Sequence, residues 1–485
     1  MPIRPLCRDQ VWLFPPSVDE LVPADHPARF VAAFVDSLDR VELLKLGIDP
    51  AGDQLGTASH SPRALLGAWL YGFLSGIRSS RKLELACREQ IPFLWISGLQ
   101  TPDHNTLWRF YKAHRLQMRK LLKRTVRTAV RVGLAELAFQ AIDGSKIAAN
   151  AAKGRTYDEK GLNKLLERTD KAIAELEAQN VTGGPKALRL PKELEKAKVL
   201  KKKVEEALEK VKAEEGPREI NLTDEDASIV KGRGGQSPGY NAQAAVVGLD
   251  EEVAKGKGML IAAVEVVKEA DDHEQLLPML QRAEEMVGER VEVSLFDGGY
   301  HSGANLEKVE ERGYRVLMAE SQRKELKSPF HKDNFTYDAT SDSYVCPKGQ
   351  ALTHRTNKKR SDGGEAKVYR GKAKVCRECE WVGECTENKR QGRSVEVGPY
   401  EEKLRKHREL MGKEESKETY KLRKQTVEPV FGIMKEVQGA RRFLLRGLED
   451  VRSEWTLLAT AFNLKSLWRV WRRGGLGMEM VWDEM

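Results

Sequence analysis

Three acidic residues stand out because of the segments in which they lie. Asp143 and Asp297 each follow an apolar, strand-like segment, and Glu428 lies in a stretch with helical periodicity. A cluster of carboxylates is unfavourable without cations, and hard oxygen ligands favour Mg²⁺ or Mn²⁺. Two such ions stabilise both the attacking and the leaving oxygen of an in-line phosphoryl displacement. The three residues therefore predict a two-metal site for phosphoryl transfer, provided that the fold brings them together.

The elements around these residues predict how they would meet. Strand patterns before Asp143 and over 240–248, 259–267, 291–296 and 314–318 alternate with helical patterns over 273–286 and 302–312. Asp143 is expected to end the first strand and Asp297 the fourth. With the helices that follow, the order β-β-β-α-β-α-β-α predicts a mixed α/β sheet of the ribonuclease-H-like type, in which strands one and four are neighbours. The two aspartates would then meet, and a helix beside the sheet would add Glu428.

Cations share the helical face of Glu428. Lys424 lies one turn before it and Lys435 two turns after it. A carboxylate flanked by cations can hold a metal while the cations hold phosphate. The alternative interpretation is a helix stabilised by (i, i+4) ion pairs, and the two strand-end aspartates argue against it.

Four cysteines fall close together, in the spacing C-x29-C-x2-C-x5-C over Cys346, Cys376, Cys379 and Cys385. The surrounding segment is poor in apolar residues, and a metal could supply the missing core. Four thiolates predict a tetrahedral structural zinc site. The alternatives are reduced free thiols or a disulfide, and His354 could substitute for one thiolate.

Charge and composition favour a nucleic-acid partner. The 485 residues include 82 Lys and Arg against 73 Asp and Glu, for a net charge of +9. Basic residues gather between Asn105 and Arg131, together with Trp108, and predict a helical DNA-binding module. The alternative is a helical bundle with a solvated basic face. No run of 18 apolar residues occurs, and no secretion signal opens the chain, so we expect a cytoplasmic protein without a membrane span.

Composition also predicts a division of the chain. The ranges are a helical DNA-binding domain at 1–135, a catalytic core in parts at 136–155, 218–325 and 413–473, a helical hairpin insertion at 156–217, a Cys-rich insertion at 326–412 and a flexible tail at 474–485. The hairpin is a solvated spacer or a clamp on DNA or a partner.

Several other residues are assigned structural roles. Asp272 is expected to cap the helix that follows it and to do no chemistry. Trp468 and Trp471 are expected in the core, with base stacking as the alternative. Cys7 and Cys87 are expected to be ordinary core or surface residues.

The motifs together resemble the DDE transposases of bacterial insertion sequences, in particular the group with a Tyr–Arg–Glu–Lys motif around the glutamate. The similar segments are Ala141-Ile142-Asp143-Gly144-Ser145-Lys146, Phe296-Asp297-Gly298-Gly299-Tyr300, Glu428 to Lys435, Pro238 to Gln243 and Thr101 to Phe110. One position departs from the strict motif, because Arg423 lies five residues before Glu428 and Lys424 occupies the expected fourth.

The resemblance implies a transposase that binds the ends of its element, cleaves DNA by two-metal-ion hydrolysis and joins the freed 3′-hydroxyl to target DNA. Asp143, Asp297 and Glu428 would hold two Mg²⁺ or Mn²⁺ ions, and a homodimer would act on DNA in the bacterial cytoplasm, associated with the nucleoid. The expected DNA-binding residues are Asn105, Arg109, Lys146, Tyr300, Tyr420, Arg423, Lys424, Lys435, Arg441 and Arg442. The alternatives are a domesticated relative that binds DNA without cutting it, and a two-metal DNA endonuclease that joins nothing.

Overall fold

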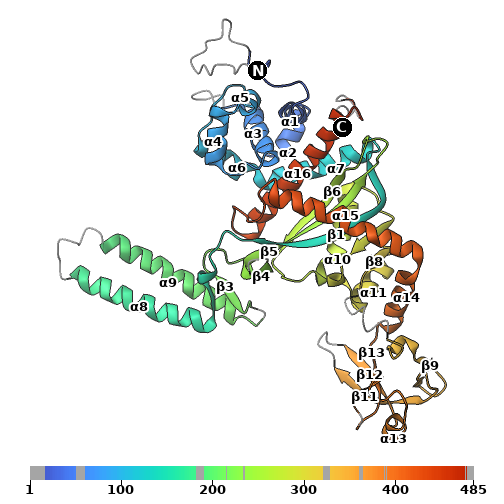
Figure 1. Ribbon diagram of the computed structural model, residues 1–485. Coiled ribbons are helices and arrows are strands. Elements are labelled where there is room, and N and C mark those ends of the chain that lie inside the picture. The colour runs from blue at the N-terminus through green and yellow to red at the C-terminus, as the bar shows by residue number, and fades with distance from the viewer. Residues whose placement is uncertain are drawn as a thin grey trace, which may run out of the picture.

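The computed structural model describes residues 17–50, 60–181, 190–214, 216–232, 235–320, 328–359, 364–386, 388, 390–475 and 477 (Figure 1). Cys7 and most of the expected tail lie outside these residues. No helix in the described ranges is long and apolar enough to cross a lipid bilayer.

The N-terminal region is helical, as the sequence predicts. Its helices are α1 (Pro27–Asp36), α2 (Arg40–Lys45), α3 (Pro62–Leu74), α4 (Ser80–Glu89), α5 (Ile91–Ile96), α6 (His104–Met118) and α7 (Lys120–Arg131). A proline opens α1 and α3, where its missing N–H costs nothing. The Asp103 carboxylate accepts a hydrogen bond from the backbone N–H of Thr106 and so caps α6.

A mixed sheet follows these helices. Its strands are β1 (Ala135–Ala148), β4 (Ser228–Gly232), β5 (Gly235–Leu249), β6 (Met259–Val267), β7 (Val293–Phe296) and β8 (Val316–Met318). The order is β4-β5-β1-β7-β8, and β6 also pairs with β5. β5 is antiparallel to β1 and β6, whereas β1, β7 and β8 run parallel. The prediction that the first and fourth strands of the core are neighbours is confirmed, since β1 pairs with β7.

Helices cover both this sheet and the N-terminal region. They are α10 (Leu276–Val287), α11 (Gly303–Glu311), α14 (Glu401–Gly412), α15 (Glu414–Glu436) and α16 (Leu448–Arg472). α15 lies against β1 and β5, and α16 lies against β6, α3, α6 and α7 (Figure 1). One cluster of buried side chains includes Phe34, Trp69, Ala141 and Trp455. The N-terminal helices and the sheet therefore share one apolar core, with α16 between them.

Two long helices extend away from the sheet (Figure 1). α8 (Glu159–Val181) and α9 (Leu190–Lys212) lie between the short paired strands β2 (Thr156–Asp158) and β3 (Glu219–Asn221). They pack along each other and, with β3, have a small core of their own, formed by Leu162, Val204, Ala207 and Ile220. We call residues 159–212 the arm.

A second sheet carries the clustered cysteines. Its strands are β9 (Thr336–Asp338), β10 (Ser343–Val345), β11 (Ala351–Lys359), β12 (Glu365–Gly371) and β13 (Ser394–Val397), in the order β13-β12-β11-β10-β9. Neither these strands nor α14 were expected from the sequence. The physical reason is that β11 is almost wholly exposed, so that it shows no alternation of apolar and polar residues.

Candidate active site

Asp143 and Asp297 lie at one edge of the mixed sheet. β7 pairs with β1 only over Phe139–Ala141, and Asp143 lies on β1 two residues beyond this pairing. Asp297 comes immediately after β7, where its carboxylate accepts a hydrogen bond of 2.8 Å from the Gly299 backbone N–H. One expectation is corrected: β1 continues to Ala148 because β5 pairs with it there, so Asp143 is inside a strand rather than at its end.

The charges of the two aspartates interact. The Asp143 side chain is 19% exposed. Burial, and next the negative charge of Asp297, raise the pKa of Asp143 to about 6, although Arg423 opposes this. Two neighbouring carboxylates are a donor set that suits a divalent cation.

Helix α15 crosses the face of β1 that carries Asp143. The Arg423 guanidinium lies 3.0 Å from the Asp143 carboxylate, and Lys435 donates a hydrogen bond of 2.6 Å to the Ser145 hydroxyl. Asp143 and Ser145 share one face of the strand because they are two residues apart. Tyr420 donates to the backbone carbonyl of Phe296, next to Asp297, at 2.9 Å. Side chains of α15 thus reach both strands that carry an aspartate.

Glu428 lies between these anchors but does not contact the aspartates. It is five residues after Arg423 and seven before Lys435, and its side chain is exposed. In the described part of the chain, its carboxylate has no hydrogen-bond or ion-pair partner. Lys424 is exposed as well, so it is Arg423, not Lys424, that is buried against Asp143. Within the described ranges, no three His, Cys, Asp or Glu side chains form a group that could hold a metal ion as they stand.

Asp272 corrects another expectation. Its side chain makes no helix-capping hydrogen bond. It instead accepts hydrogen bonds from Lys146 at 3.2 Å and from the side-chain amides of Asn241 and Gln243 at 2.7 Å each. Sequence reasoning missed this group, although Asn241 and Gln243 alternate as polar residues within an apolar strand.

Two residues expected to bind DNA are engaged inside the protein. The ammonium group of Lys146 is paired with Asp272. The phenol of Tyr300 is fully buried, and it donates a hydrogen bond to the side-chain carbonyl of Gln243. Both side chains therefore belong to the polar interior beside the aspartates.

The loop after α15 brings arginines to the end of β1. Phe443 N–H donates to the carbonyl of Ala148 at 2.9 Å, and Ala148 N–H donates to the carbonyl of Arg441 at 3.3 Å. Arg442 is exposed, and Arg441 forms an ion pair with Glu436. Arg441 and Arg442 thus lie beside Ala148, which is five residues after Asp143 on β1.

The N-terminal basic residues divide into two groups. Asn105 and Arg109 are exposed, one turn apart on α6. Four of the basic residues that follow form ion pairs with other elements; the pairs are Arg115 with Asp450, Arg119 with Glu449, Lys123 with Glu285 and Arg124 with Glu42. For α7 this favours the helical-bundle alternative, because its positive charge joins elements of the protein to one another.

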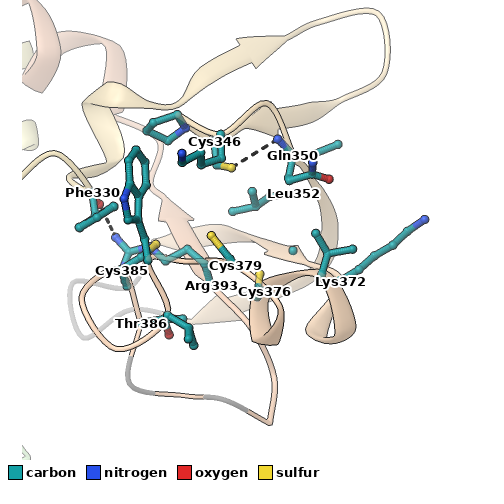
Figure 2. Close-up of a pocket in the computed structure, with 17 residues that line it drawn as sticks. Phe330, Cys346, Gln350, Leu352, Lys372, Cys376, Cys379, Cys385, Thr386 and Arg393 are labelled. Atoms are coloured by element: carbon teal, nitrogen blue, oxygen red, sulfur yellow. Dashed lines mark hydrogen bonds between the residues drawn. The ribbon is translucent and has the colours of Figure 1, made fainter.

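The four clustered cysteines line one cavity of about 210 Å³, and all four are free thiols (Figure 2). Cys346 lies in a tight turn, in which the Gln350 backbone N–H points at its sulfur at 3.4 Å. Cys376 and Cys379 come from the end of α13 (Ala373–Arg377), and Cys385 from the loop after it. The disulfide alternative does not apply to this structure.

The backbone comes close to these sulfurs. A Cβ atom on Gly371 or on Gly392 would lie 3.0 or 3.1 Å from the Cys376 sulfur. Apolar side chains including Leu352 and Trp381 line the same cavity. Thiolates are ligands that zinc prefers, but in the described ranges the four cysteines do not form a group that could hold a metal ion as they stand.

Comparison with known proteins identifies the class. Residues 345–468 match the family model described as Transposase DDE domain, and residues 16–113 match the one described as Transposase domain (DUF772). The first match contains Glu428 and the four cysteines, and the second contains Asn105 and Arg109. No curated protein matches the chain.

These matches define an enzyme of the DDE transposase type, in which cleavage and transfer of DNA strands depend on a divalent metal. Its function is DNA transposition.

Proposed function

We propose that the chain is the transposase of a bacterial insertion sequence of the Tyr–Arg–Glu–Lys group. It binds the ends of its element, cleaves phosphodiester bonds and joins the freed 3′-hydroxyl to target DNA. The observation that carries this proposal is the convergence of Asp143 and Asp297 at one sheet edge, where the charge of Asp297 helps to raise the pKa of Asp143 and α15 packs against β1.

Asp143, Asp297 and Glu428 are proposed to hold two Mg²⁺ or Mn²⁺ ions. When bound, such ions supply an activated water and stabilise the charge on the leaving oxygen. Glu428 is exposed between two anchored residues of α15, so its side chain is free to turn toward the aspartates. Until then the Arg423 guanidinium balances the charge of Asp143.

Cations around Glu428 are proposed to hold DNA phosphates. The Nε atom of Arg423 is buried and has no hydrogen-bond partner among the described residues, which leaves one donor for a phosphate oxygen. Lys424, Lys435, Arg441 and Arg442 would add charge along the same path, with Tyr420 beside them. Asn105 and Arg109 on α6 are proposed to read the element ends, since these side chains reach base edges in the major groove.

The arrangement of the chain supports further parts of the proposal. We propose that the arm and the cysteine-carrying sheet are insertions into a ribonuclease-H-like core, with the domain boundaries given above. Two copies would hold the two element ends as a homodimer, in the cytoplasm where the bacterial chromosome lies.

Zinc is proposed for Cys346, Cys376, Cys379 and Cys385. Support comes from their convergence on one cavity and from the Arg393 guanidinium, whose charge offsets that of a Cys385 thiolate. The expected result is one zinc per chain by metal analysis, lost in Cys379→Ser and kept in the control Cys87→Ser, whose thiol is buried elsewhere. Wild-type protein without zinc would overturn the assignment.

The function is tested with DNA that carries the element ends, Mg²⁺ and mapping of the products. Asp143→Ala, Asp297→Ala and Glu428→Ala should each abolish cleavage and leave DNA binding largely intact. Glu418→Ala is the matched control, because Glu418 is an exposed glutamate of the same helix and, among the described residues, its carboxylate pairs only with Lys421. Cleavage without joined products would favour an endonuclease, and binding without cleavage a domesticated relative.

A further inference from the structure

We propose that Asp272 is a positioning residue of the active site, which fixes the segment of β1 beside Asp143 relative to the turn that follows Asp297. The inference rests on the proposed function, in which these two aspartates hold the metal.

Asp272 connects two strands at the site. One carboxylate oxygen, Oδ1, accepts hydrogen bonds from Lys146 of β1 and from Asn241 and Gln243 of β5. Gly144, next to Asp143, lies directly against this group. A Cβ atom there would overlap Oδ1 of Asp272 and the side-chain amide of Gln243. The carboxylate thus holds the backbone of β1 at the residue beside Asp143.

A second path leads from Asp272 to Asp297. Gln243 donates through its amide nitrogen to Asp272 and accepts through its carbonyl oxygen from the Tyr300 hydroxyl. Tyr300 closes the short helix η3 (Gly298–Tyr300), which Asp297 caps. Asn305 adds a link, because its amide donates to the backbone carbonyls of Tyr300 at 2.8 Å and His273 at 2.7 Å. The turn after Asp297 is therefore tied to the segment that carries Asp272.

In this network of hydrogen bonds, each donor group faces an acceptor. Asn241 and Gln243 both turn amide N–H groups toward Asp272, and the Asn241 carbonyl oxygen accepts from Gln243. Burial, followed by the charges of Asp272, Asp143 and Asp297, raises the pKa of Tyr300 well above its ordinary value, so the phenol remains a donor. The oxygen acceptor at position 272 is thus matched by the donors of two amides and an ammonium group.

Geometry also places Asp272 near the metal site. A Cβ atom on Gly299 would lie 3.0 Å from Oδ1 of Asp297 and 3.6 Å from Oδ2 of Asp272. The two carboxylates therefore both approach the same side of Gly299. A shift of about 1 Å in a catalytic group can cost about 10²-fold in rate, so loosening this network should reach the metal ligands.

The test compares Asp272→Asn with Asp271→Asn. Asp271 is the exposed neighbour, whose side chain has no partner among the described residues. Mn²⁺ affinity is measured by calorimetry on the full chain without DNA, together with urea unfolding and binding of end DNA in chelator. Asp272→Asn should weaken Mn²⁺ binding about 10–100-fold, with DNA affinity unchanged, and Asp271→Asn should match wild type. Equal Mn²⁺ affinity in the two variants would overturn the proposal.

Two further variants keep the test decisive if Asp272→Asn does not fold. Tyr300→Phe removes only the hydrogen bond to Gln243 and should weaken Mn²⁺ binding by less than Asp272→Asn is expected to. Wild-type affinity in Tyr300→Phe would contradict the path to Asp297. Asp143→Ala separates the two hypotheses: if it leaves Mn²⁺ binding unchanged, the proposed metal site fails, whatever the role of Asp272.

Discussion

At the scale of single residues, cations of the protein itself offset the negative charge of the carboxylates in the site. Arg423 neutralises Asp143, and Lys146 neutralises Asp272. Arg423 comes from α15, which packs against β1, and Lys146 comes from β1 itself. Arg423 offsets the unfavourable burial of the Asp143 charge only in part, because the pKa of Asp143 is still raised.

Asp143 should make the metal-free protein less stable as the pH rises from about 4 to about 6. The pKa of Asp143 is raised from 3.8 to about 6 on folding, so in this interval the folded state keeps a proton that the unfolded state has lost. The contribution of Asp143 to stability is thus complete below the unfolded pKa and disappears as the pH passes the folded pKa. Its size is on the order of 3 kcal/mol.

This pH effect is measured by urea unfolding in chelator at several pH values between about 4 and 7. Asp143→Asn should lack the part of the pH dependence that comes from this carboxyl. Parallel curves for wild type and variant would contradict the prediction.

At the scale of elements, a buried ion pair connects the N-terminal helices to the loop that carries Arg441 and Arg442. Arg78, between α3 and α4, lies 2.6 Å from Glu454 of α16 and also donates to the carbonyl of Arg442. Glu454 in turn accepts from the backbone N–H groups of Leu444 and Leu445. The loop beside the active site is thus fixed by α16 and by the N-terminal helices together.

Glu454→Ala should destabilise the protein by about 3–5 kcal/mol, because it leaves Arg78 buried without its partner. The Glu454 side chain is only 2% exposed. Glu418→Ala breaks an exposed ion pair and should cost no more than about 1 kcal/mol. Free energies of unfolding in urea give both values, and similar losses in the two variants would argue against a fixing role for the buried pair.

At the scale of the whole molecule, one large hydrophobic core is shared by several parts of the chain, and two smaller hydrophobic cores are separate from it. The N-terminal helices, the mixed sheet and α16 contribute to the first, whereas the arm and the cysteine-carrying sheet each have their own. A separate core means that an element can be removed without leaving a cavity in the catalytic sheet.

Removing the arm should therefore leave the rest folded. Asp158 and Glu219 are paired in β2 and β3, so an Asn-Gly turn can replace residues 159–218. The free energy of unfolding should change by no more than about 2 kcal/mol, from exposure of Ile220. A variant that fails to fold, or a much larger loss, would show that the arm stabilises the sheet. Binding of end DNA by the same variant tests the clamp hypothesis.

Two parts of the molecule should contribute to DNA binding in different ways, one to sequence preference and one to overall affinity. Arg109→Ala should reduce the preference for end DNA over random DNA by about 1–3 kcal/mol. Lys435→Ala should weaken both DNAs about equally and lower the salt dependence by about one phosphate contact. Binding to both DNAs at two salt concentrations measures this. An unchanged specificity ratio in Arg109→Ala would place end recognition elsewhere.

Local patterns in the sequence were enough to predict much of this protein. The pairing of the first and fourth strands of the core followed from the ribonuclease-H-like order, and the type of enzyme from the resemblance to DDE transposases, whereas local patterns predicted the N-terminal helices and the strands and helices around Asp143 and Asp297. Such features follow from apolar periodicity and from residues that flank a strand, which depend on near neighbours in the chain. The strands β9 to β13 escaped prediction because their small core leaves most of β11 exposed.

Only the tertiary structure decided which charged groups face one another. The sequence motif left Arg423 and Lys424 as alternatives, and burial of one face of α15 against β1 selects Arg423 to contact Asp143. Asp272 looked like a helix cap, yet its partner Lys146 lies 126 residues away. The physical reason is that a carboxylate's role is set by the donors that surround it in space, and those donors come from strands that the fold, not the chain order, brings together.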